Sequence, residues 1–318
     1  MSENVRTEFA AKNTKPILVT GAAGFVGRNI VSSLRQLGFK VRALVRQNTA
    51  DLDSTVEQVV GNILDRATLA PAVEGSAAVI HLVGIIQPTR NAGFVQVHAQ
   101  GTANVIAAAQ AVGVKRFIQM SALGVRANAR SIYHQTKWQA EQTVRESSMS
   151  WTIFRPSMIH GPGGEFSNML RNWATGKAPP FLFMPYFGGG VLGQKPVSKI
   201  QPIYVGDVAE FFVHAIKNPH SMNKTYELGG PQSMTWPEFL HAAAQAIGGH
   251  TRFPGGIPIW LAKAMSRLAL PGLPFTYDQV LMAQEDNTCD MTAALNDFPG
   301  LALHSFPETA REYYKTMQ

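Results

Sequence analysis

The sequence is poor in cysteine, in charged residues and in long apolar runs. Its 318 residues include one cysteine, Cys289, so no intrachain disulfide can form and nothing requires an oxidising compartment. Only 15% of the residues are charged, against roughly 25% in typical soluble domains. No run reaches the roughly 18 apolar residues of a membrane-spanning helix. With 45% hydrophobic residues, the composition excludes a disordered chain and predicts one large or two ordinary globular domains.

Basic residues outnumber acidic ones, but they form no dense run. The formal net charge is +7, with Lys and Arg scattered along the chain and no interleaved aromatic residues. This distribution argues against nucleic-acid binding and is compatible with an anionic cofactor or the anionic face of a membrane. No Cys/His cluster has zinc spacing, so we predict no metal site.

The first residues mix both charge signs and contain no apolar core. We therefore interpret residues 1–14 as a flexible tail and not as a signal or transit peptide. The expected location is cytoplasmic, with peripheral contact to a membrane or a respiratory complex left open.

One apolar pattern, within residues 257–270, has helical spacing. Lys263 and Arg267 interrupt it, and Pro258 and Pro271 delimit it. The apolar positions are Trp260, Leu261, Ala264, Met265 and Leu268. We expect a helix packed on the core; the alternative is a helix that lies in a membrane interface.

The first half of the chain alternates short apolar runs with amphipathic stretches. The runs predict strands at residues 17–20, 41–45, 58–60, 78–83 and 116–120. Helical patterns follow the first strand, ending at Gly38, and cover residues 94–112. This alternation predicts an α/β fold, a Rossmann-like doubly wound parallel sheet with a smaller, mostly C-terminal substrate domain.

The predicted domains are not contiguous in sequence. Residues 15–160 plus about 199–228 are expected to form the nucleotide-binding domain. Residues 161–198 and 229–318 are expected to form the smaller domain for substrate or partner.

A glycine-rich turn, Gly21-Ala22-Ala23-Gly24-Phe25-Val26-Gly27, follows the first predicted strand. The first glycine allows a tight turn, the second lets the backbone approach a pyrophosphate, and the third lets helix and strand pack closely. Free amides at the helix start attract the phosphates. The spacing between a strand and a helix predicts a dinucleotide site. Its candidate contacts are Gly21, Ala23, Gly24, Phe25, Val26 and Gly27.

The end of the second predicted strand indicates which nicotinamide cofactor is preferred. An NAD site has an acid there for the ribose hydroxyls, whereas an NADP site accepts arginine. This chain has Arg46, with Arg28 as a second cation and no acid before Asp51. We therefore favour NADP(H) over NAD(H). The alternative is that Arg46 is only a solvated residue at a strand end.

Tyr133 and Lys137 are four residues apart after the fifth predicted strand. On a helix both lie on one face, so the ammonium can lower the phenol pKa and hold the nicotinamide ribose. Together with the glycine turn, this pair resembles the extended and atypical short-chain dehydrogenase/reductase superfamily, which includes epimerases and dehydratases. The resemblance implies that Tyr133 is the general acid/base and Lys137 its partner in hydride transfer with a nicotinamide.

Further segments carry the resemblance toward the C-terminus. They imply that Asn62 and Ile63 cup the adenine, and that the loop after the fourth strand passes the cofactor. The remaining residues implied in cofactor binding are Leu82, Val83, Gly84, Pro156, Ser157 and Met158. Asp207 lies where a late helix begins and is interpreted as an N-cap.

Two positions depart from the family pattern. Where the family has a second Ser or Thr that binds the substrate oxygen, this chain has Ala122, preceded by Ser121. Ser121 is our candidate replacement, with Ser131 as another, and a purely structural hydroxyl as the alternative. His98 stands where the family usually has Asn and is interpreted as a packing residue.

Within the superfamily, residues 155–168 and 275–280 resemble the dehydrogenase-like accessory subunit of respiratory complex I and its bacterial relatives. Two functions therefore stay open. The first is an NADP(H)-dependent oxidoreductase or epimerase acting at a carbinol or carbonyl carbon of a small, apolar or quinone-like substrate. The second is a non-catalytic NADPH-holding protein of a respiratory complex or quinone pathway. Residues 179–190 would form apolar walls of the substrate site or close the core of the small domain.

Overall fold

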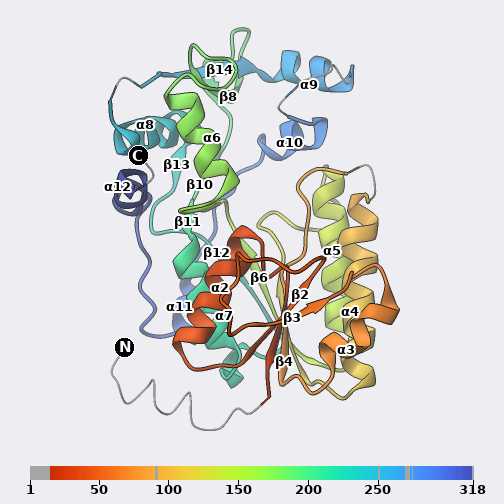
Figure 1. Ribbon diagram of the computed structural model, residues 1–318. Coiled ribbons are helices and arrows are strands. Elements are labelled where there is room, and N and C mark those ends of the chain that lie inside the picture. The colour runs from red at the N-terminus through yellow and green to blue at the C-terminus, as the bar shows by residue number, and fades with distance from the viewer. Residues whose placement is uncertain (1–14, 90–91, 250, 269–272, 274, 317–318) are drawn as a thin grey trace.

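A seven-stranded parallel sheet forms the centre of the larger part of the molecule (Figure 1). The computed structural model describes residues 15–89, 92–249, 251–268, 273 and 275–316. The strand order is β12-β6-β5-β4-β1-β2-β3. The strands are β1 (Ile17–Thr20), β2 (Val41–Val45), β3 (Glu57–Val60), β4 (Ala78–His81), β5 (Arg116–Met120), β6 (Ser150–Pro156) and β12 (Lys224–Leu228). The predicted Rossmann-like fold is confirmed, and the five predicted strands are present with ends shifted by at most two residues.

Helices cover both faces of this sheet, as the alternating pattern predicts. On one face lie α2 (Phe25–Gln36), α7 (Val205–Ala215) and α11 (Thr292–Asp297); on the other lie α3 (Leu69–Val73), α4 (Gly101–Ala111) and α5 (Ile132–Glu146) (Figure 1). The short turns are η1 (Arg66–Thr68) and η3 (Pro219–Ser221). The helix predicted over residues 94–112 is present, but its first part, η2 (Val95–Gln100), is a π-helix.

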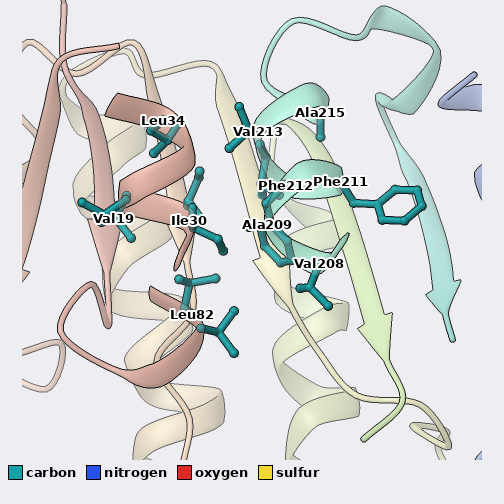
Figure 2. Close-up of a cluster of buried hydrophobic side chains, with 14 of the residues drawn as sticks. Val19, Ile30, Leu34, Leu82, Val208, Ala209, Phe211, Phe212, Val213 and Ala215 are labelled. Atoms are coloured by element: carbon teal, nitrogen blue, oxygen red, sulfur yellow. The ribbon is translucent and has the colours of Figure 1, made fainter. Parts of the chain in front are cut away.

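The packing of α2 against α7 holds the glycine turn in place. Ile30 and Leu34 of α2 face Ala209 and Phe212 of α7, and none of the four has exposed surface (Figure 2). Burying one large apolar side chain contributes about 1.5–3 kcal/mol. The start of α2 is therefore fixed at the carboxyl end of β1, where the sheet order reverses between β1 and β4.

The smaller part of the molecule has its own buried core. Its strands are β7 (Ile159–His160), β8 (Met184–Gly189), β9 (Lys195–Pro196), β10 (Lys199–Ile200), β11 (Ile203–Tyr204), β13 (Met234–Thr235) and β14 (Pro254–Pro258). Its helices are α6 (Glu165–Ala174), α8 (Trp236–Ile247), α9 (Ile259–Arg267), α10 (Tyr277–Met282) and α12 (Phe306–Thr316). Leu170, Phe239, Phe306 and Tyr314 meet in one cluster from α6, α8 and α12. The predicted domain boundaries stay a prediction.

The apolar segment before β9 belongs mainly to this core. Met184 and Tyr186 alternate along β8 and are buried in the cluster, as expected for a strand with one covered face. Phe181 and Leu182, just before the strand, are exposed. Met184 and Tyr186 therefore close the core of the small domain, which was one of the two roles predicted for residues 179–190.

The prediction of a core-packed helix at residues 257–270 is wrong. A helix is present as α9, with Pro258 as its N-cap, but Ala262 is its one buried residue. Trp260 and Leu268 are 59% and 72% exposed. The helix has only nine residues and follows β14 on the small three-stranded sheet β14-β8-β9, and among the described residues most of its side chains remain partly or fully exposed. Pro271 lies outside the described residues.

Asp207 is not the N-cap of its helix, which is Tyr204. It lies in the first turn of α7, where its carboxylate accepts hydrogen bonds from the backbone N and the Nδ1 of His304, at 2.8 and 2.5 Å. The N-cap prediction for Asp207 is therefore wrong by three residues, because the carboxylate lies inside the helix and pairs with His304. Among the described residues, no helix is long and apolar enough to cross a membrane.

Candidate active site

The glycine turn between β1 and α2 is shaped by close backbone contact. Gly21 has a φ of 76°, a backbone conformation that is strained in any residue with a side chain. A Cβ added to Gly27 would lie 2.1 Å from the carbonyl oxygen of Gly21, so only glycine lets the helix pack here. The N-cap, Gly24, offers no side-chain cap, and the first turn holds no acid. The first amides of α2 are thus left for an external anion, which fits a dinucleotide diphosphate.

The two predicted cations occupy different positions. Arg46 follows β2 directly and is exposed. Within the described part of the chain, it pairs with no carboxylate. Arg28 instead donates from Nη1 to the carbonyl of Ala23 at 2.7 Å, so it braces the glycine turn. Arg46 is therefore an exposed cation at the end of β2, and its contact with the cofactor stays a prediction.

Three of the other predicted cofactor contacts have buried side chains. Val26, Ile63 and Leu82 are buried in the apolar cores on the two faces of the sheet. The side-chain oxygen of Asn62 accepts a hydrogen bond from the backbone N of Leu64 at 3.0 Å, so this side chain stabilises the turn in which it lies. Ala23, Phe25 and Val83 keep partial exposure on the turn and the loop after β4.

The predicted contacts after β6 are tied to a distant segment. The Ser157 hydroxyl donates to Oδ1 of Asn287 at 2.6 Å, and the backbone N of Met158 donates to the same oxygen at 3.1 Å. Pro156 is buried beside them at the end of β6. These hydrogen bonds hold the segment after β6 against Asn287, and the Ser157 hydroxyl is one of the structural donors.

Tyr133 and Lys137 lie on α5, one turn apart, as predicted. The Tyr133 ring packs edge-on against His98, with centroids 5.3 Å apart, and keeps partial exposure. Lys137 is 3% exposed and donates from Nζ to the Met120 carbonyl at 3.2 Å. A Cβ on Gly84 would come within 2.9 Å of Nζ. The structure thus brings the predicted pair, the end of β5 and the loop after β4 together at one edge of the sheet.

The predicted lowering of the Tyr133 pKa is not found. Burial raises the pKa of the Tyr133 phenol to about 12. Burial also lowers the pKa of Lys137 to about 8, partly offset by the charge of Glu141. At neutral pH the phenol therefore holds its proton and most of the ammonium stays charged.

His98 is a fully partnered packing residue in this structure. Its Nε2 lies 3.1 Å from the backbone N of Ile85, and its Nδ1 lies 2.9 Å from Oγ1 of Thr136. Nε2 also lies 3.1 Å from the Ile85 carbonyl oxygen, so both ring nitrogens have hydrogen-bond partners. Burial and the Lys137 charge lower the pKa of His98 to about 2, so the ring is neutral. The π-helix η2 is the element that brings this ring against Tyr133.

Both candidate serines have structural hydrogen-bond partners. The Ser121 hydroxyl is 3% exposed and donates to Oε1 of Glu141 at 2.5 Å. The same carboxylate binds Arg145 and Arg155 at 2.7 Å each. Ser131 is the N-cap of α5, accepting from the backbone N of His134. A buried carboxylate with two guanidinium partners needs every hydrogen bond it has, so Ser121 has a structural partner and its catalytic role stays a prediction.

A C-terminal segment for which the sequence predicted no structural role holds the start of α5. Asp278 of α10 accepts from the backbone N of Ile132 and of Tyr133 at 2.8 and 3.0 Å. Glu285 forms a two-bond pair with Arg126, at 2.7 and 2.8 Å. Asp278 therefore caps α5 from a position 145 residues further along the chain. Residues 275–280 stood out in the sequence only as a family resemblance.

We expect Asp278→Ala to loosen the start of α5. Loss of a helix cap should lower the free energy of unfolding by about 1–2 kcal/mol and speed hydrogen exchange at the amides of Ile132 and Tyr133. Urea unfolding and amide exchange measure these effects. Asp53→Ala, which removes an exposed carboxylate bonded to Thr55, is the control. Unchanged exchange at Ile132 and Tyr133 would contradict the capping role.

Comparison with known proteins identifies NAD(P)H-binding relatives. A family model described as NAD(P)H-binding matches residues 21–170. The chain is 31% identical over 258 residues to the complex I subunit "NADH dehydrogenase [ubiquinone] 1 alpha subcomplex subunit 9, mitochondrial" of Arabidopsis thaliana, covering 78% of this chain and 61% of that protein. It is 32% identical over 241 residues to a ceramide reductase of Caulobacter vibrioides, covering 74% and 72%.

Solved structures show the same fold. The UDP-glucose 4-epimerase of Thermus thermophilus in complex with NAD superposes with a TM-score of 0.71, at 18% identity, over 94% of this chain and 99% of that one. The chain thus matches NAD(P)-binding proteins over 94% of its length in fold and over about three quarters of its length in sequence. It belongs to the family of NAD(P)-binding proteins that includes the complex I subunit and the ceramide reductase, and it has the fold of the epimerase-like short-chain dehydrogenase/reductases.

Proposed function

We propose that this protein is an NADP(H)-dependent oxidoreductase that acts at a carbonyl or carbinol carbon. The observation that carries the proposal is the Tyr133–Lys137 pair at the sheet edge where the glycine turn presents its free amides. The protonated phenol of Tyr133 would donate to a carbonyl oxygen, and Lys137 would stabilise the phenolate that is left. A bound nicotinamide supplies or accepts the hydride. Epimerisation by reversible oxidation uses the same groups.

The substrate class we propose is an apolar carbonyl compound. The Caulobacter relative is named a ceramide reductase, which supports a lipid-like substrate here. Half-buried aromatic side chains near the small sheet agree with this, since Phe187 and Phe275 meet with ring centroids 5.0 Å apart. A quinone-like substrate is chemically similar and is the next class to test.

A second function is favoured by one specific feature, the missing hydroxyl at Ala122. In that case the protein holds NADPH as a structural group beside a respiratory complex, in a quinone pathway, or during assembly. The complex I subunit and a relative named as a photosystem II assembly factor, from Trieres chinensis, support this alternative. The chain matches only 61% of the length of the Arabidopsis protein, so its partners are carried over only as a proposal.

Preference for NADPH is expected to depend on Arg46. Arg46→Ala should weaken NADPH binding at least tenfold and change NADH binding less than about twofold, because only NADPH has a 2′-phosphate for the guanidinium. Calorimetric titration with both nucleotides measures this. Lys40→Ala removes an exposed cation just before β2 and should leave both affinities unchanged. Equal loss for NADPH and NADH would contradict the assignment.

Tyr133→Phe should abolish turnover without preventing cofactor binding. We expect the reduction of long-chain ketones or quinones, followed by NADPH absorbance, to fall by about 10²–10⁴. Tyr186→Phe, whose hydroxyl contacts the Gln194 carbonyl in the small sheet, should keep full activity.

The pH profile provides a second readout of the same pair. Because the folded pKa of Lys137 is about 8, its charge is present below that value and lost above it. Reduction should therefore decline as the pH rises through about 8. A Tyr133→Phe protein with unchanged turnover, or a wild-type protein that reduces none of these substrates while holding NADPH, would favour the non-catalytic function.

A further inference from the structure

Exposed apolar side chains gather on two segments of the smaller part of the molecule. Eight of the 15 exposed large hydrophobic residues in the described chain lie within residues 166–206 and 239–277, which are about a quarter of the sequence. All three exposed aromatic residues are among them. We call this set the apolar rim: Phe181, Leu182, Val191, Leu192, Phe253, Trp260, Leu261 and Leu268.

The same two segments contain no acidic residue. Neither residues 166–206 nor residues 239–277 include an Asp or a Glu. Together they carry seven basic residues, and the rest of the chain has 21 basic and 21 acidic residues. The whole formal charge of +7 therefore resides in the segments that expose the apolar rim. Those basic residues are Arg171, Lys177, Lys195, Lys199, Arg252, Lys263 and Arg267.

Contacts join the two segments at one end of the molecule. β8 pairs in parallel with β14, and the turn after β8 carries Val191 and Leu192. The Trp260 ring nitrogen at the start of α9 donates to the Val191 carbonyl at 3.2 Å. At the other end of the sheet, Arg252 donates from Nε to the Phe181 carbonyl at 2.9 Å. Figure 1 shows β8, β14 and α9 together, far from β4 and α3.

We propose that the apolar rim and its basic residues dock this protein on an anionic lipid bilayer. A short helix with exposed Trp and Leu residues beside Lys and Arg is the pattern of a segment lying in the membrane interface. Among the described helices none can span a bilayer, so contact is from one side only. Charge complementarity selects the occupant, because the two segments that expose the apolar rim carry basic residues and no acidic ones, which favours anionic phospholipid headgroups.

The docking face is connected to the candidate active site. Arg267 at the end of α9 donates to the Tyr277 hydroxyl at 2.8 Å, and Tyr277 begins α10, the helix from which Asp278 caps α5. Under the function proposed above, an apolar substrate would reach Tyr133 from the membrane side. The docking itself depends only on the surface and is tested without turnover.

Vesicle flotation with the full chain tests the proposal. We expect the protein to float with vesicles that contain about 30 mol% phosphatidylglycerol and at least tenfold less with pure phosphatidylcholine. Raising the salt from about 0.1 to about 0.5 M should release it, because screening weakens the charge attraction.

Two variants and two matched controls assign the binding to the rim. Val191→Ser/Leu192→Ser/Trp260→Ser and Lys195→Glu/Lys263→Glu should each reduce flotation at least tenfold. Val112→Ser/Met222→Ser and Lys40→Glu/Lys115→Glu alter exposed residues of the larger part and should bind as the wild type does. NADPH affinity and thermal unfolding should be unchanged in all four.

Three results would overturn the proposal. One is no flotation of the wild type with anionic vesicles, and another is equal loss in the controls. The third is a dimer in solution that the rim variants dissociate, since the face would then belong to a second copy. Because NADPH binding is measured separately, failure of docking is distinguishable from failure of the proposed function.

Discussion

The contact between the start of α2 and the end of β1 is the constraint on which the site depends. Helix and turn approach so closely that a Cβ at Gly27 would overlap the Gly21 carbonyl oxygen. The packing of α2 on α7 holds this geometry from the far side. As a result, the free amides at the start of α2 lie where the strand order reverses between β1 and β4. In this first turn, neither a side-chain cap nor an acidic residue competes with a bound anion.

The second determinant of the site is the C-terminal segment that reaches back to the sheet. Asp278, Glu285 and Asn287 contact the start of α5, the loop after β5 and the residues after β6. These contacts place Tyr133 and Lys137 relative to the cofactor turn. The smaller part of the molecule therefore holds the start of α5 through the Asp278 carboxylate, and it also exposes the apolar rim next to that connection.

Sequence patterns predicted the elements whose signals are local. The run Ile17–Thr20, the glycine spacing and the apolar repeat of α2 specify strand, turn and helix without reference to the rest of the chain. The four-residue spacing of Tyr133 and Lys137 likewise needed only a helix. These parts of the site agree with the structure because each depends on residues close together in sequence.

What the sequence could not predict depends on distant partners. The commitment of Ser121 to Glu141 and the capping by Asp278 join residues 20 and 145 positions apart. Burial raises the pKa of Tyr133, and the spacing of residues in the sequence does not indicate how deeply a side chain is buried. The exposure of α9 depends on the absence of a covering layer among the described elements, whereas its apolar spacing alone is identical to that of a buried helix.

Direct measurement of nucleotide binding tests whether the amides at the start of α2 bind the diphosphate of NADPH. Titration calorimetry of the purified full chain with NADPH should show saturable binding with one nucleotide per chain, and 2′-phospho-ADP-ribose should compete for the same site because it carries the diphosphate and the 2′-phosphate. An absence of heat with NADPH, together with no nucleotide retained on purification, would contradict the account.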